Sequence, residues 1–313
     1  MNFYKKNLRE VFGETLVELG EYYKNMLVLD ADLHTSTRTF LFKDKYPQRF
    51  IQCGIAEANE FGIAAGLAHV GFIPFPSTFA AFAARKALDQ IYMNICCQNL
   101  NVKIPGSYTG MTATECGPSH NVGEDIAIMR SMPNMRVVDP GDNKELRSVM
   151  HEIMKIDGPV YFRVSKAETP VLFDDDYCFE WGKGIVLKEG KDITIMSTGI
   201  MTGICLKAAE FLEKEDIKAE VIHMPSIKPI DEDLIVKTAK KTGCVLTVEN
   251  GRVIGGFGSA VCEVLSKEYP VVTDLMGIGN TTIKSASLSE LIRYYKLTPA
   301  DVVLRAKKLL LKK

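Results

Sequence analysis

Several common functional signals are missing from this chain of 313 residues. Its eight cysteines include no Cys-x-x-Cys spacing, so no zinc site is indicated and we expect reduced thiols. The first ten residues, MNFYKKNLRE, are already charged and do not have the form of a signal peptide. We therefore expect a cytoplasmic protein with no metal ligands of its own.

Charge and hydrophobicity exclude two further classes of partner. The formal net charge is −1, so no field of the whole protein attracts nucleic acid or an anionic membrane. Residues 61–84 contain no Asp, Glu, Lys or Arg, but Pro74 and Pro76 interrupt this stretch and exclude a continuous spanning helix. We expect two buried helices joined by a short strand there, and neither a nucleic-acid nor a membrane partner.

Strand-like apolar runs alternate with helical runs along most of the chain. The first series comprises expected helices at 81–97 and 142–156 and expected strands at 25–33, 71–75, 101–107, 135–140 and 159–165. Such alternation predicts a parallel sheet covered by helices on both faces. An acidic, irregular stretch at 169–184 separates this series from a second, smaller one. We therefore expect two doubly wound α/β domains, at 1–172 and 183–313.

A glycine-rich turn, ENGRVIGGFGSAV (249–261), lies between an expected strand and an expected helix of the second domain. Such turns can bind phosphate through the amide groups of the helix N-terminus. The glycine spacing is not that of the G-x-G-x-x-G fingerprint, and the chain contains no Walker A lysine motif. We interpret the stretch as a structural turn.

Three polar residues stand out. Glu57 lies in the first turn of an expected helix, 55–69, that is apolar almost all the way round and is therefore expected to be buried. Burial would raise the pKa of Glu57 and allow proton exchange near neutrality, although the helix macrodipole alone also favours an acid there. His120 follows a strand in a Gly/Pro loop, where it faces either a cleft or solvent. Arg163 lies inside an apolar strand and must meet an anion or a carboxylate.

Seven segments, taken in order, resemble transketolase. The last, TVENGRVIGGFGSAV (247–261), resembles its C-terminal domain. The others resemble its pyrimidine-binding domain: DADL (30–33), CGIAEANEFGIAAGLA (53–68), PSTFAAF (76–82), GPSH (117–120), RSMPNMRVVDPGDNKEL (130–146) and YFRVS (161–165). The resemblance covers essentially the whole chain. It implies a pyrimidine-binding domain of the thiamine-diphosphate fold, with a parallel sheet, followed by a smaller transketolase C-terminal α/β domain.

The resemblance implies that five residues contact thiamine diphosphate. Glu57 matches the catalytic glutamate that hydrogen-bonds N1′ of the aminopyrimidine and stabilises the imino tautomer, whose 4′-nitrogen removes the proton from thiazolium C2. Asp32 and Leu33 match a loop that contacts the cofactor across the subunit boundary. Phe79 and Phe82 match the aromatic residues that stack around the pyrimidine.

A further group is implied to bind the substrate. His120 matches the catalytic histidine near the reacting carbons, and Arg9, Ser36 and Arg163 match groups that hold the sugar phosphate. The full set of expected substrate-binding residues is Arg9, His34, Ser36, Tyr108, Cys116, His120 and Arg163.

Three positions depart from the family pattern. Tyr108 replaces a histidine, Cys116 replaces an acidic residue, and Arg85 replaces the third aromatic residue of the pyrimidine pocket. The arginine adds donors suited to an oxyanion, and the lost acid removes an acceptor for a sugar hydroxyl. We therefore expect a sulfonated or branched ketose to be preferred to xylulose 5-phosphate, with service of the ordinary pentose phosphate pathway as the alternative.

The G-D-G…N motif that holds Mg²⁺ and diphosphate in transketolases is missing, since PGDN at 140–143 is interpreted as a helix cap. The resemblance therefore implies the C-terminal subunit of a split transketolase, which transfers a two-carbon ketol unit from a ketose phosphate, or a modified ketose, to an aldose. We expect the Mg²⁺ ligands in an N-terminal partner subunit, dimerisation through helix 55–69, and an α2β2 heterotetramer. The alternatives are a subunit like 1-deoxyxylulose-phosphate synthase or the 2-oxoacid dehydrogenase beta chain, and a cofactor-free regulatory or assembly subunit.

Overall fold

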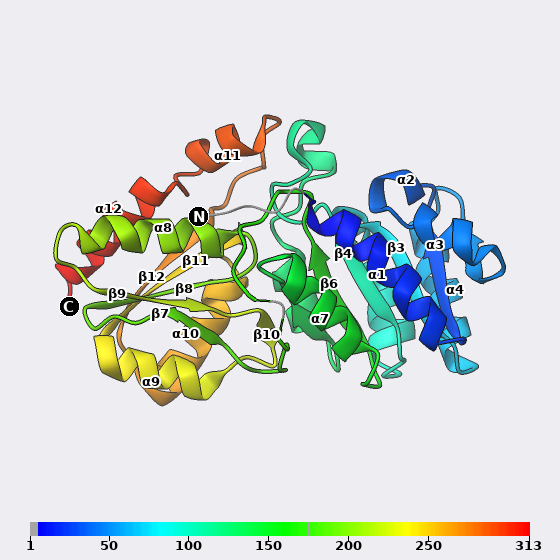
Figure 1. Cartoon of the computed structure of the whole chain (residues 1–313), viewed down its shortest axis with the longest axis horizontal. Helices are drawn as coiled ribbons and strands as arrows, with labels where there is room; N and C mark the ends of the chain where they lie inside the picture. Colours follow the sequence, from blue (N-terminus) through cyan, green and yellow to red (C-terminus); the bar gives the residue numbers. More distant parts are fainter. Residues whose placement is uncertain (1–5, 175) are drawn as a thin grey trace.

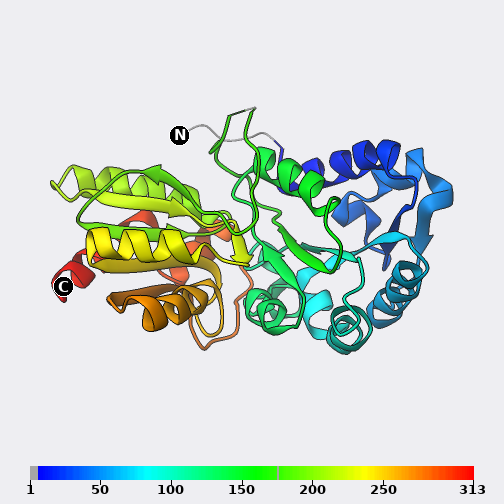
Figure 2. The same cartoon turned by 90° about the horizontal axis from the view of Figure 1, so that it is seen from below.

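The computed structural model describes residues 6–174 and 176–313, which form two α/β domains side by side (Figure 1). The first domain is built on a seven-stranded sheet in the order β10-β5-β6-β4-β3-β1-β2, and the second on a five-stranded sheet in the order β12-β11-β8-β9-β7. Helices cover both faces of each sheet, as seen in Figure 2. The expected fold class is confirmed.

The first sheet is parallel except at one edge. Its parallel strands are β1 (Met26–Asp30), β2 (Phe50–Gln52), β3 (Ile73–Phe79), β4 (Lys103–Ser107), β5 (Arg136–Val138) and β6 (Val160–Val164). Its helices are α1 (Leu8–Tyr22), α2 (His34–Thr37), α3 (Phe40–Lys45), η1 (Pro47–Arg49), α4 (Glu57–His69), α5 (Ala80–Arg85), η2 (Gln90–Cys96), η3 (Thr114–Ser119), α6 (Asp125–Ser131) and α7 (Asn143–Ile153). Among these, η1 and η3 are 3-10 helices and η2 is a π-helix.

The second domain supplies the one antiparallel strand at the edge of the first sheet. Its own sheet contains β7 (Ile185–Lys188), β8 (Ile193–Ser197), β9 (Ala219–His223), β11 (Cys244–Arg252) and β12 (Val272–Ile278), with β7 antiparallel to β9. Its helices are α8 (Met201–Glu213), α9 (Glu232–Thr242), α10 (Phe257–Glu268), α11 (Leu288–Tyr294) and α12 (Pro299–Leu310). The short strand β10 (Ser226–Lys228) leaves this domain and pairs antiparallel with β5 of the first.

Alternation along the strands of the first domain directs side chains into two cores. In β6, Val160, Phe162 and Val164 pack with residues of α1 and α7, whereas Tyr161, between Val160 and Phe162, packs with residues of α5 and α6 on the opposite face. The core that contains Tyr161 continues into the second domain, where it includes residues of α9 and α10. The two domains therefore share a hydrophobic core.

Local details differ in part from the expected elements. The expected helix at 81–97 is interrupted, because α5 ends at Arg85 and the π-helix η2 begins only at Gln90. The expected strand at 71–75 extends instead to Phe79. The expected cap of the helix after PGDN is confirmed, since Asp142 Oδ1 accepts a hydrogen bond from the Glu145 amide at 2.9 Å.

Helix α4 is buried on one face only. Glu57 and Phe61 are buried, but Gly62 and Gly66 each have open space where a side chain would extend. Ile55, just before the helix, is 78% exposed. The expectation of burial on all sides is therefore not met within a single chain, and an apolar face of α4 stays open.

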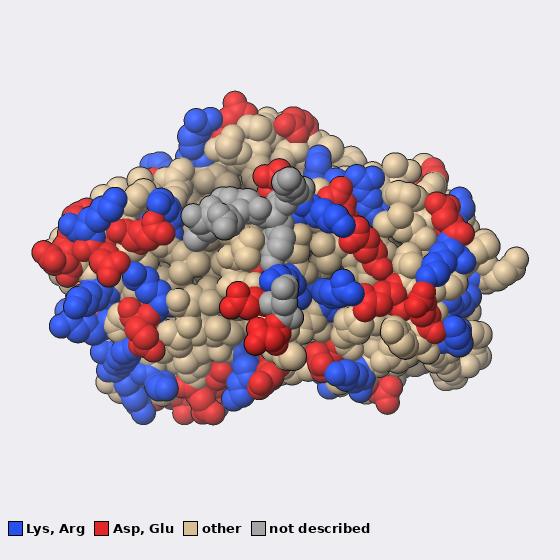
Figure 3. All heavy atoms as spheres, viewed as in Figure 1, with Lys and Arg blue, Asp and Glu red and all other residues tan. Residues whose placement is uncertain are grey.

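Among the described residues on the face seen in Figure 3, positive and negative side chains are interspersed. No helix within residues 6–174 and 176–313 is long and apolar enough to cross a membrane. All eight cysteines lie in these ranges, and each is a free thiol.

Candidate active site

Most of the predicted site residues lie at the carboxyl ends of neighbouring parallel strands, the edge at which α/β sheets bind ligands. Strand β1 leads through residues 31–33 into the short helix α2, β2 leads into α4 with Glu57 at its start, β3 ends at Phe79, and Tyr108 follows β4 directly. These four strands are adjacent in the order β4-β3-β1-β2. The segments that follow them therefore meet at one edge of the sheet.

An aromatic cluster forms the centre of this edge. The ring of Phe79 stacks on Phe82 with centroids 5.5 Å apart and contacts Tyr108 with centroids 4.3 Å apart. The His120 ring meets Phe79 and Phe82 edge-on, at 5.7 Å and 5.2 Å. Leu33 packs against the same cluster. The predicted cofactor residues Leu33, Phe79 and Phe82 thus lie beside the predicted catalytic histidine.

Glu57 is connected to this cluster through a lysine. Its side chain is buried, and its Oε1 accepts a hydrogen bond from Lys86 Nζ at 2.9 Å. The same Nζ lies 4.2 Å from the centroid of the Phe82 ring, a position that favours a cation–π interaction. Lys86 was not predicted from the sequence, although its position four residues after Phe82 favours contact between the two side chains.

Arg9, Ser36 and Tyr108 form a positively charged end of the site. Arg9 Nη1 donates to the Tyr108 hydroxyl at 2.5 Å and to the Ser36 carbonyl at 3.0 Å. A second cation, Lys166 Nζ, lies 5.4 Å from the centroid of the Tyr108 ring. Lys166 was not predicted, although it directly follows the last residues of an expected strand. Two cations beside the same tyrosine suit an anionic group.

The loop after β1 is held by Asp30, which is fully buried. Its Oδ1 accepts from the Leu33 amide at 2.7 Å, and burial raises the pKa of this carboxyl. His34 follows this loop as the first residue of α2, and its ring packs edge-on against Phe50 with centroids 6.4 Å apart. The structure therefore places His34 beside β2 and Asp30, outside the aromatic cluster.

The predicted residues Asp32, Tyr108 and Cys116 have either an unusual backbone conformation or an exposed side chain. Asp32 and Tyr108 adopt left-handed conformations, with φ of 64° and 61°, which are costly for residues other than glycine and are often found at functional sites. The Asp32 side chain is exposed, and so is that of Cys116 on η3. Neither Asp32 nor Cys116 is buried against the aromatic cluster in the single chain.

Arg85 does not present a free fork of donors to a substrate. Its Nε donates to Glu124 Oε1 at 2.7 Å, its Nη1 to the Pro118 carbonyl at 2.9 Å, and its Nη2 to the Asn121 carbonyl at 3.1 Å. Because all three nitrogens are engaged by the protein, the expectation that Arg85 binds an oxyanion is corrected.

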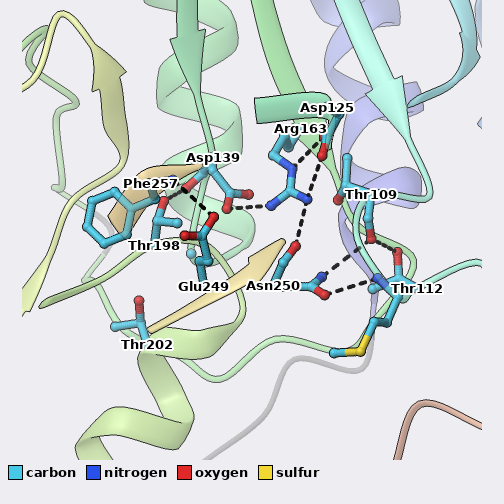
Figure 4. A network of polar contacts seen from close by, with 12 residues as sticks. Thr109, Thr112, Asp125, Asp139, Arg163, Thr198, Thr202, Glu249, Asn250 and Phe257 are labelled. Carbon is cyan, nitrogen blue, oxygen red and sulfur yellow. Dashed lines mark hydrogen bonds and ion pairs between the residues drawn. The ribbon is translucent and has the colours of Figure 1, made fainter. Parts of the chain in front are cut away.

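Arg163 also differs from the role that the resemblance implied. It is buried, and Figure 4 shows its guanidinium between Asp125 and Asp139. Nε donates to Asp125 at 2.8 Å, Nη1 to Asp139 at 2.9 Å, and Nη2 to the Asn250 carbonyl of the second domain at 2.8 Å. A carboxylate partner for Arg163 is thus confirmed, whereas phosphate binding by Arg163 is wrong, because the protein interior already satisfies its donors.

The glycine-rich turn of the second domain is closed by the protein's own carboxylate. Glu249 accepts hydrogen bonds from the amides of Phe257 at 3.0 Å and Gly258 at 2.9 Å, at the N-terminus of α10. These amides are the groups that would otherwise bind a phosphate. The interpretation as a structural turn is confirmed. Burial raises the pKa of Glu249 to about 7.

This shift predicts a pH-dependent stability. Between pH 4.5, the ordinary pKa, and about 7, the folded state holds a proton on Glu249 that the unfolded state has released, so the free energy of unfolding falls as pH rises. The shift corresponds to about 3 kcal/mol. Glu249→Gln keeps a carbonyl acceptor but does not titrate. The free energy of unfolding of the variant, relative to that of the wild type, should therefore rise by about 3 kcal/mol from pH 5 to pH 8. Denaturant unfolding at both pH values measures the difference, and parallel profiles of the two proteins would contradict the assignment.

No group of three or more His, Cys, Asp or Glu side chains within the described ranges is arranged to hold a metal ion.

Comparisons with known proteins agree with this geometry. Residues 5–171 match the family model "Transketolase, pyrimidine binding domain", and residues 182–302 match "Transketolase, C-terminal domain". The chain is 41% identical over 303 residues to a "Putative transketolase C-terminal section" of Methanocaldococcus jannaschii, which covers 96% of this chain and 95% of the relative. It is 39% identical over 296 residues to "6-deoxy-6-sulfo-D-fructose transketolase subunit SqwH" of a Clostridium species, which covers 95% and 92%.

A solved structure extends the likeness to three dimensions. It is described as "Split gene transketolase, inactive beta4 tetramer", is 46% identical to this chain, and covers 97% of both chains with a TM-score of 0.88. The chain therefore belongs to the transketolase family, and its residues match the pyrimidine-binding and C-terminal domains of that family.

Proposed function

We propose that this chain is the catalytic C-terminal subunit of a two-polypeptide transketolase that depends on thiamine diphosphate. Together with an N-terminal subunit it transfers a two-carbon ketol unit from a ketose phosphate, or a modified ketose, to an aldose. The observation that carries this proposal is the grouping of Glu57, the Phe79–Phe82 pair, His120 and Arg9 at one edge of the first sheet. Turnover by the reconstituted pair of subunits tests it.

The residues present fit the aminopyrimidine half of the cofactor. Leu33 and Phe82 are only partly buried, so they offer apolar surface for a flat ring, and Lys86 connects Phe82 to the carboxyl of Glu57. When bound, thiamine diphosphate supplies an electron sink at the substrate carbonyl carbon. Glu57 would hold a proton at a pyrimidine nitrogen, the aromatic residues would orient the ring and exclude water, and His120 would hold or release a proton at a substrate oxygen. We assign the Mg²⁺ and diphosphate ligands to the N-terminal subunit.

The open face of α4 supports a role in assembly. Helices α4 and η2 pack against each other, and several large apolar side chains on and around them are exposed, namely Ile55, Val70, Phe72, Leu88, Tyr92 and Met93. Exposed apolar surface of this kind marks protein interfaces. We propose that it joins two copies of this subunit in an α2β2 heterotetramer. The tetramer of beta subunits in the relative's structure supports self-association.

The substrate proposal is based on the positively charged end and on two departures from the family pattern. Arg9 and Lys166 lie beside Tyr108, where the family carries a histidine, and Cys116 offers a weaker acceptor than the usual acid. The Clostridium relative is described as acting on a sulfonated ketose. We propose a ketose with a sulfonated or branched end as the preferred donor of this chain.

The ratio of kcat/KM values tests this preference. We expect the best modified ketose to exceed xylulose 5-phosphate by about tenfold or more, because a polar site discriminates against substrates that leave its groups unpaired. Tyr108→His should move the ratio toward xylulose 5-phosphate. If xylulose 5-phosphate with ribose 5-phosphate surpasses every modified sugar, the enzyme serves the ordinary pentose phosphate pathway.

A further inference from the structure

One arginine side chain binds backbone carbonyls of the loop that carries His120. Arg85 is the last residue of α5, and its Nη1 and Nη2 donate to the carbonyls of Pro118 and Asn121, at 2.9 Å and 3.1 Å. These two carbonyls lie on either side of His120 in the chain. One guanidinium therefore binds the backbone on both sides of the histidine. Its planar arrangement of several N–H donors suits two carbonyls at once, whereas a lysine ammonium is a compact point charge.

The same helix also holds the ring of His120. Phe82 lies three residues before Arg85, and its ring centroid is 5.2 Å from that of His120. The Ser119 hydroxyl contacts His120 Nδ1 at 2.8 Å. Helix α5 thus determines both the backbone of the loop, through Arg85, and the position of the imidazole, through Phe82.

Glu124 fixes the guanidinium itself. Its Oε1 accepts from Arg85 Nε at 2.7 Å, while its Oε2 lies 3.3 Å from Arg252 Nε of the second domain. Arg252 in turn donates to the carbonyls of Gly279 and Thr281 at 3.0 Å. The exposed Arg85 side chain is therefore linked through Glu124 to Arg252 of the second domain.

We infer that Arg85 is a positioning residue, which sets His120 against the Phe79–Phe82 pair by holding the carbonyls on both sides of it. The inference rests on the proposed function for the role of His120 in the reaction. The loop has other ties that preserve its fold, since the Asn121 side chain donates to the carbonyls of Thr114 at 2.9 Å and Gly117 at 3.1 Å. Loss of Arg85 should therefore displace the histidine without unfolding the domain.

The kinetic test uses the reconstituted enzyme. Arg85→Met should lower kcat by about tenfold to a hundredfold, because a displacement of about 1 Å has effects of this size, and should leave KM for the donor within about threefold. The double variant Arg85→Met with His120→Asn should be no slower than His120→Asn alone, within about twofold, because both changes remove the same contribution. Losses that multiply would contradict action through His120. A rise in KM with unchanged kcat would assign Arg85 to substrate binding instead.

Arg130→Met is the matched control. Arg130 donates to Glu263 at 3.0 Å and to the Gly255 carbonyl at 3.2 Å, so it also joins a carboxylate and a backbone carbonyl, but without contact to the histidine loop. We expect unchanged kcat in this variant. An equal loss in both variants would show a general effect of removing a surface arginine and would overturn the inference.

A second measurement needs no turnover. The chain contains five histidines, and His120→Gln identifies the ring signal of His120 in carbon–proton NMR spectra of the subunit. Because the flanking phenylalanine rings shift this signal, Arg85→Met should move it and Arg130→Met should not. An unmoved His120 signal in Arg85→Met would overturn the inference. Failure of the wild-type pair to turn over any ketose would contradict only the proposed function, since the NMR result stands without it.

Discussion

Replacement of Glu57 by Gln should lower turnover of the reconstituted enzyme by at least about a hundredfold, which is the usual contribution of acid–base catalysis. Glu57 is buried at the start of α4 and is connected to the aromatic cluster through Lys86, so its carboxyl is placed to exchange a proton with a ring bound there. An amide keeps the shape and the hydrogen-bonding capacity but cannot exchange that proton. Steady-state rates with saturating cofactor and donor give the measurement.

Glu60→Gln is the control on the same helix. Glu60 lies one turn further along α4 and is fully buried. Burial and the nearby Asp30 raise the pKa of Glu60 well above its ordinary value, so glutamine resembles the neutral acid already present. We expect Glu60→Gln to keep most of the activity. If Glu57→Gln retains more than about a tenth of the wild-type rate, Glu57 has no acid–base role.

The second large effect concerns the partner subunit. The purified chain alone should neither bind thiamine diphosphate tightly nor turn over a ketose, because its described residues offer no cluster of metal ligands and the glycine-rich turn is closed by Glu249. Addition of the N-terminal subunit with Mg²⁺ should restore both properties. Isothermal titration calorimetry of each subunit and of the mixture measures the change.

Two results would contradict the proposed roles of the two subunits. Micromolar binding of thiamine diphosphate by this chain alone would show that the diphosphate site does not need the partner. In the complex, sedimentation or light scattering should show two copies of this subunit, since the exposed apolar residues around α4 and η2 need cover. A single copy would exclude the proposed dimer contact.

Local patterns in the sequence determined the two α/β domains, because strands and helices follow from apolar periodicity over a few residues. The candidate site residues came instead from the resemblance to transketolase. Glu57, Phe79 and Tyr108 come together because carboxyl ends of adjacent parallel strands meet at one edge of the sheet. The helix cap at Asp142 is equally local, since its partner lies three residues away.

Only the tertiary structure decided the roles of the arginines. Arg163 and Arg85 are both plausible anion ligands in sequence, yet each is engaged by protein acceptors that lie far away along the chain. Arg163 meets Asp125 at a separation of 38 residues and Asn250 at 87, and Arg85 meets Glu124 at 39. A guanidinium satisfies its donors with whichever acceptors folding brings near, and those acceptors leave no local signal. The pairing of β10 with the first sheet and the placement of Lys86 and Lys166 depend on long-range packing in the same way.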